Sequence, residues 1–170
     1  LSSGIQQSVG TTLSNIGKHD QAVGVLECVH DAEPKNVENL TTLASTLHIL
    51  GRSEEAAELH KEAIRLQPEN FRAYWLLGQM QRATDEQNYI DMFSESLAKN
   101  PGKLQARICL NFGLAKQFED VGRYDESFEC LQRGSAGVLE HTSYPEDQDE
   151  RMQAMIMRSW DDDFFASNKK

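Results

Sequence analysis

The segment VENLTTLASTLHILGRSEEAAELHKEAIRLQPEN, residues 37–70, decides the fold of this chain. Its apolar residues recur three and four positions apart, as at Leu40, Leu43 and Leu47, which predicts one helix before Gly51 and another after it. Gly51 favours a left-handed helix end, and Pro68 prevents the second helix from continuing. The segment therefore predicts two antiparallel helices joined by a tight corner.

The same glycine and proline positions return along the chain at a nearly constant period. Gly17 and Gly51 are 34 residues apart, as are Pro34 and Pro68, and Pro101 follows 33 residues later. A fixed period of this length indicates stacked helical repeats. We therefore predict an all-α solenoid of about four helix-turn-helix units within residues 1–136, with the bounds 3–36, 37–70, 71–103 and 108–136.

Small side chains recur where the two helices of a pair would cross. In residues 37–70 these are Ala44, Ala56 and Ala63, and Ser53 is expected to cap the second helix. Together with the spaced leucines, Gly51 and Pro68, this layout resembles the tetratricopeptide repeat. The resemblance implies that the solenoid is right-handed.

The third unit and the C-terminal part depart from the repeat. Asp85 stands where a corner glycine is expected, and the following helix is predicted over about residues 87–99. Residues 137–145 predict a turn, and residues 146–166 predict a capping helix that shields the last repeat. A docking surface is the alternative for this helix. Its apolar stripe is formed by Met152, Met155, Ile156, Trp160 and Phe164.

Composition excludes several classes of function. The net charge is −10, and residues 119–163 hold 13 acidic against 4 basic side chains, so neither nucleic acid nor an anionic membrane is an expected partner. Three scattered cysteines form no Cys-x-x-Cys pair, which predicts no metal site, no disulfide framework and a cytoplasmic location. Known catalytic and phosphate-binding motifs are absent, so we expect no enzyme activity and no cofactor.

The tetratricopeptide resemblance implies that the first helix of each pair lines a concave groove. On this basis the expected partner-binding residues include an aromatic and basic cluster in the third unit, because Trp and Arg dominate binding hot spots. Trp75 has two interpretations, an exposed anchor or a side chain packed between neighbouring repeats. The full predicted set is His48, Arg72, Trp75, Gln79, Arg82, Phe112 and Lys116.

The segment LNFGLAKQFEDVGRYDESFECLQRG, residues 110–134, carries a second resemblance. It is similar to the last repeat of bacterial proteins that join tetratricopeptide repeats to a sulfotransferase domain. The resemblance implies a covalently attached downstream domain, because the phosphosulfate-binding loop of that family does not occur in these 170 residues.

Three functions follow from these patterns. The leading prediction is a non-catalytic scaffold that binds a protein or peptide in its groove. The second is the N-terminal region of a larger sulfotransferase, and the third is a structural solenoid that associates with itself through its ends.

Overall fold

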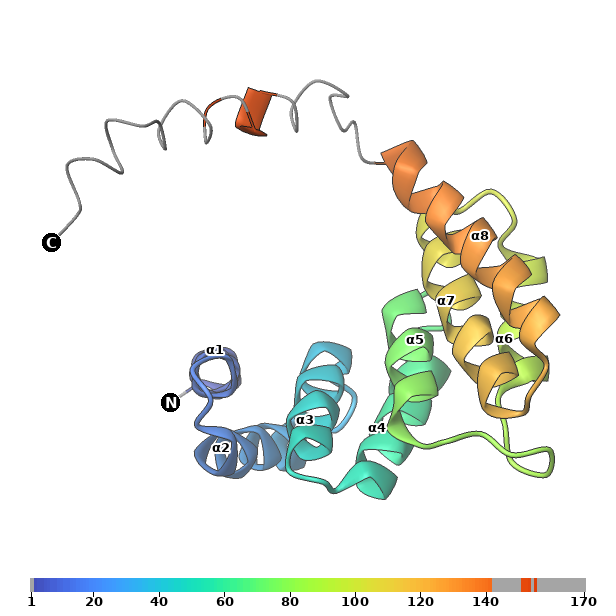
Figure 1. The fold of residues 1–170 in the computed structure, drawn as a ribbon. Helices are drawn as coiled ribbons and strands as arrows, with labels where there is room; N and C mark the ends of the chain where they lie inside the picture. The colour runs from blue at the N-terminus through green and yellow to red at the C-terminus, as the bar shows by residue number, and fades with distance from the viewer. Residues whose placement is uncertain (1, 142–150, 154, 156–170) are drawn as a thin grey trace, which may run out of the picture. The chain divides into compact units, whose positions relative to one another are not determined.

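The computed structural model describes residues 2–141, 151–153 and 155, and these contain helices and no strand (Figure 1). The chain divides into two units, residues 1–137 and 138–170, and the helix pairs belong to the first except for residues 138–141 at the end of their last helix. The main helices are α1 (Ser3–Asn15), α2 (His19–Ala32), α3 (Val37–Ile49), α4 (Ser53–Leu66), α5 (Phe71–Met80), α6 (Ile90–Lys99), α7 (Leu104–Asp120) and α8 (Tyr124–His141).

The helices of the first unit stack in chain order. Helix α3 packs against α4, its own partner, and against both α1 and α2 of the preceding pair. Helix α7 likewise packs against α5 and α6. Each new first helix thus covers the pair before it, which is how a solenoid builds a continuous core from units that cannot bury their apolar faces alone. The predicted all-α repeat solenoid is confirmed.

Three glycines make the tight corners. Gly17, Gly51 and Gly122 have φ angles of 80°, 81° and 77°, a left-handed backbone that glycine adopts without a steric penalty. At the second corner the Arg52 N–H donates to the Leu47 carbonyl at 3.0 Å, and the Gly51 N–H donates to the His48 carbonyl at 2.9 Å. These bonds satisfy carbonyls that the end of α3 would otherwise leave unpaired.

The prediction that Ser53 caps α4 is wrong. The N-cap residue is Arg52, and no side-chain hydrogen bond caps the helix there. Ser53 instead shares a hydrogen bond of 3.0 Å with Nδ1 of His48, across the corner. The tight corner brings the end of α3 beside the start of α4, so this hydroxyl finds a ring nitrogen rather than a backbone N–H.

Small residues allow the close helix contacts. Ala44, Ala56 and Ala63 have no exposed surface. A Cβ added to Gly10 would lie 2.6 Å from Leu26, so α1 approaches α2 as closely as it does because residue 10 has no side chain. Phe93 fills the equivalent space in the third unit, where it contacts both Gly78 and Gly113.

The third unit has no glycine corner. Helix α5 ends at Met80, Gln81 is extended, and residues 81–89 run to α6, which begins at Ile90 and so three residues later than predicted. Two side chains of α7 fix this connection. Gln117 accepts from the Tyr89 N–H at 2.8 Å and donates to the Gly78 carbonyl at 3.2 Å, and Asp120 accepts from the Ala83 N–H at 3.0 Å.

Helix α8 continues to His141, into the range 137–145 for which a turn is predicted. Gly134 and Gly137 lie inside this helix, where the lack of a side chain makes room for Phe112 and Ile108 of α7. Residues 142–145 lie outside the described part of the chain, as does the predicted capping helix 146–166 apart from residues 151–153 and 155.

Candidate partner-binding surface

The first helices of the four pairs, together with the connection between α4 and α5, line an open cavity of about 610 Å³. Its walls combine hydroxyl, amide and charged side chains, with few apolar groups. The residues that line it are Thr11, Ser14, Asn15, Val37, Glu38, Thr41, Thr42, Ser45, Gln67, Glu69, Asn70, Phe71, Arg72 and Gln105. We call this cavity the polar groove.

Hydroxyl groups on α3 form one wall of the polar groove. Thr41 donates to the Val37 carbonyl at 2.7 Å, Thr42 to Glu38 at 3.0 Å, and Ser45 to the Thr41 carbonyl at 2.9 Å. Each side chain therefore bonds to the backbone one helical turn earlier. This holds the hydroxyl oxygens in fixed positions along the groove wall.

A second open cavity, of about 410 Å³, lies between α5, α7 and α8. We call it the aromatic pocket. Trp75 and Leu131 line it and are 38% and 42% exposed, so each presents apolar surface without being fully solvated. Its other lining residues are Gln79, Phe112, Ala115, Lys116, Glu119 and Ser127.

Lys116 on the wall of the aromatic pocket is held by an ion pair. Its Nζ lies 2.5 Å from Oδ2 of Asp120, whose side chain is only 10% exposed. Burial acts to raise the pKa of Asp120, but the hydrogen bonds from Lys116 and from the Ala83 N–H outweigh it and lower the pKa. Lys116 therefore fixes the acid that anchors residues 81–89 while it also lines the pocket.

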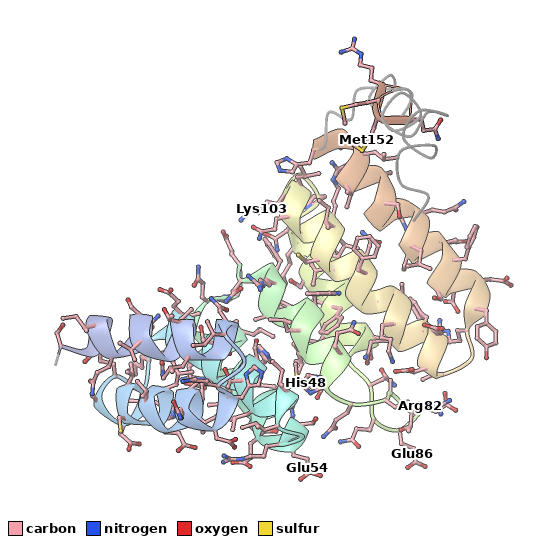
Figure 2. The ribbon with its side chains drawn as sticks, turned by 60° about the vertical axis from the view of Figure 1, so that its left-hand side comes forward. His48, Glu54, Arg82, Glu86, Lys103 and Met152 are labelled. Atoms are coloured by element: carbon pink, nitrogen blue, oxygen red, sulfur yellow. The ribbon has the colours of Figure 1, made fainter. Side chains whose placement is uncertain are left out.

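The structure divides the predicted binding set among different places. Trp75, Gln79, Phe112 and Lys116 meet in the aromatic pocket, and Arg72 lines the polar groove. Arg82 lines neither and lies on the connection between α5 and α6, as Glu86 does (Figure 2).

His48 also lies outside both cavities, because its ring bonds to Ser53 at the corner between α3 and α4. Sequence reasoning missed Leu131. It comes from a second helix, whereas the tetratricopeptide resemblance implies binding residues on first helices. A usable signal existed, since Leu131 follows Gly122 at the spacing by which the buried Leu26 follows Gly17.

His60 is a buried group outside these cavities. It has no exposed surface, and neither ring nitrogen has a hydrogen-bond partner. Burial lowers its pKa to about 4, with the nearby charges of His48 and Arg72 acting in the same direction. The ring is therefore neutral near pH 7 and serves as an apolar filler between helices.

The described residues contain neither a metal-binding cluster nor a membrane-spanning helix. Across residues 2–141, 151–153 and 155, no three His, Cys, Asp or Glu side chains gather as a metal ion would need. The three cysteines are free, and burial raises the pKa of the Cys109 and Cys130 thiols. In the same part of the chain no helix has the length and apolar character to cross a membrane.

Comparison with known sequences finds the repeat where the spacing predicts it. Residues 37–70 match the sequence profile of the tetratricopeptide repeat. No curated protein matches the chain.

Solved structures show the same fold over most of the chain. A crystal structure of MamA is similar with a TM-score of 0.62 and 18% identity, covering 84% of this chain and 82% of that one. Residues 41 to the end of MamA from Desulfovibrio magneticus RS-1 give a TM-score of 0.57 and 14% identity, covering 79% and 75%.

A tetratricopeptide repeat protein from Parabacteroides merdae ATCC 43184 gives a TM-score of 0.61 and 22% identity, covering 80% of this chain and 52% of that one. At such identities the likeness concerns the fold alone. The fold is that of a tetratricopeptide solenoid.

Proposed function

We propose that this chain is a non-catalytic scaffold that holds a protein or peptide partner along its first helices. The observation that carries the proposal is the aromatic pocket, where Trp75 is 38% exposed beside Phe112 and Leu131. A half-exposed Trp beside further apolar side chains is the usual anchor of a protein interface. The polar groove supplies hydrogen-bonding groups along the same row of first helices.

The two cavities differ in polarity, which suggests how a partner is recognised. The apolar end accepts a large side chain, since Trp75 and Leu131 offer apolar surface there. The polar end offers hydroxyl and amide groups together with Glu38, Glu69 and Arg72. Apolar burial supplies affinity, and the placed polar groups supply orientation and specificity. Three free cysteines also support the cytoplasm as the location.

Peptide selection tests this proposal. A random peptide library displayed on phage is selected against the wild-type chain, and the affinity of the enriched peptides is measured by titration calorimetry. Trp75→Ala together with Arg72→Ala should weaken binding about tenfold or more while the melting temperature falls by only a few degrees. Tyr124→Ala is the matched control, because Tyr124 is 69% exposed and lines neither cavity.

Two results would count against this function. Enriched peptides that bind the double variant as tightly as wild type would place the contact elsewhere. A large loss of stability in Trp75→Ala would show that this ring is a core residue, the other interpretation of its position.

A second candidate, the N-terminal region of a larger sulfotransferase, is supported by residues 110–134 alone. Reading the gene downstream of Lys170 tests it. A phosphosulfate-binding loop in the same reading frame would support this candidate, and a frame without one would exclude it.

A further inference from the structure

The outer face of α1 carries an apolar stripe. Ile5 and Val9 are 52% and 42% exposed, and Ile16, the C-cap residue, is 62% exposed. Leu13 lies in the same row and is partly buried against the core. Ile5, Val9 and Leu13 line an open cavity of about 400 Å³ along this helix. A row spaced by three and four residues is a helix face made for packing.

The repeat identifies what this face is for. Advancing by the 34-residue period takes Val9 to Leu43 and Leu13 to Leu47, and both leucines are 2% exposed. They belong to α3, which packs on the preceding pair α1 and α2. The stripe on α1 is therefore the surface by which a first helix covers the pair before it.

Hydrogen bonds confirm how α3 uses this surface. Asn39, the counterpart of Ile5, donates from Nδ2 to the Leu26 carbonyl at 3.0 Å. Thr46, the counterpart of Thr12, shares a bond of 3.0 Å with Ser14. The partner of such a stripe is thus a helix pair that presents a residue like Leu26.

The last helix pair, α7 and α8, presents such a partner surface. Leu26, His60 and Leu131 each lie nine residues beyond a corner glycine, and Phe93, like Leu26 and His60, lies eight residues before a proline. The first three of these four positions in chain order have no exposed surface, whereas Leu131 is 42% exposed and opens onto the aromatic pocket. The aromatic pocket therefore lies where a further first helix would pack.

We propose that α1 of a second copy of this chain occupies the aromatic pocket, so that copies stack head to tail. The proposal rests on the proposed function, because it assigns a partner to that same pocket. Its basis is the packing of α3 on the pair α1 and α2. The chain carries the same two surfaces again, unpaired among the described residues, as the stripe on α1 and the aromatic pocket at α8. Charge does not oppose it, since residues 2–17 hold no charged side chain to be repelled by Lys116 or Glu119.

The two faces differ, so the contact is heterologous and one copy can always add to the next. The wild-type chain should therefore grow in mass with concentration beyond a dimer. Analytical ultracentrifugation from about 1 μM to about 500 μM covers the affinities expected of such a small contact.

Variants of each face test the geometry. Ile5→Glu with Val9→Glu blocks the stripe, and Leu131→Glu blocks the aromatic pocket. Each should weaken association about tenfold or more, because a carboxylate would be buried without a partner. All of these side chains are at least 42% exposed, so circular dichroism should show unchanged helix content. Ile49→Glu, at a residue that is 59% exposed and lines none of these cavities, is the control and should associate as wild type does.

Mixing the two blocked variants is the sharpest test. The stripe variant keeps an intact aromatic pocket and Leu131→Glu keeps an intact stripe, so the mixture should form a one-to-one dimer that does not grow further. A monomeric wild type, a mixture that stays monomeric, or association that survives Leu131→Glu would each overturn the proposal. Selected peptides that still bind the monomeric stripe variant would leave the proposed function standing, so the two failures are distinguishable.

Discussion

The second and third repeats hold their helix pairs together by different means. In the second, Gly51 and the backbone bonds around it close the corner within a few residues. In the third, Gln117 and Asp120 reach back from α7 to hold residues 81–89. One corner is made by its own sequence, and the other by residues a whole repeat away.

This difference has a consequence for folding. The second pair needs only local contacts to define its corner, whereas the connection of the third becomes fixed when α7 docks. A unit whose connection depends on the next unit is coupled to it more strongly than nearest-neighbour packing alone requires.

The largest effect on stability is expected at Phe93, the buried side chain at the centre of the third helix pair. Phe93 is fully buried against Gly78 and Gly113. Phe93→Ala should lower the free energy of unfolding by about 4 kcal/mol, because it leaves a cavity among three helices. Urea denaturation measures this loss. Leu131→Ala, at the equivalent but 42% exposed position of the fourth unit, should cost less than about 1 kcal/mol, and equal losses would show that Leu131 is as buried as Phe93.

His60 occupies in the second repeat the place of Phe93 in the third. Its folded pKa, about 4, lies below the ordinary value of 6.5, so the unfolded chain takes up the proton first. The contribution of His60 to the free energy of unfolding is thus fully present above about pH 7. The free energy of unfolding should fall by about 3 kcal/mol as the pH drops to about 4. Urea denaturation at several pH values measures this slope. His60→Phe should remove most of the loss in that range, and an unchanged slope would assign it to other groups.

Gln117 tests the remote clamp directly. It is 1% exposed, and Gln117→Leu would leave the Tyr89 N–H and the Gly78 carbonyl without their partner. We expect a loss of about 2 kcal/mol and faster hydrogen exchange in residues 81–89, measured by mass spectrometry. Gln79→Leu, an exposed glutamine, is the control. Unchanged exchange in residues 81–89 would mean that the clamp does not hold them.

Gly51 tests the local corner and should give the smallest change. Its φ of 81° disfavours a side chain, although an added Cβ would meet no atom within 4 Å. Gly51→Ala should therefore cost about 1 kcal/mol through the backbone alone. Gly102→Ala is matched to it, because Gly102 also has open space but no positive φ, and should be near neutral in thermal unfolding. A similar cost at both glycines would refute the backbone explanation.

The parts of the fold that sequence could predict are those whose signals are local. Gly17, Gly51 and Gly122 mark corners in the sequence, and all three have positive φ. The start of α6 could not be placed, because its position depends on Gln117, 28 residues beyond Tyr89. Nor could the sequence alone show that Gly134 and Gly137 lie inside α8, where they make room for side chains of α7.

The candidate surface was predictable to the same degree. The tetratricopeptide resemblance implies that Trp75, Gln79, Phe112 and Lys116 face the groove, and these four line one pocket. Periodicity alone could not show that residues 81–89 carry Arg82 away from that pocket. Nor could it show that His48 bonds to Ser53 at the corner.

The hydroxyl wall of the polar groove has a directional consequence. Thr41, Thr42 and Ser45 have each given their only proton to a backbone carbonyl, so toward the groove their oxygens can only accept. The carboxylates of Glu38 and Glu69 on the same cavity are also acceptors. These groups therefore favour hydrogen-bond donors, such as amides and ammonium groups, and make few hydrogen bonds to a ligand that has only acceptors.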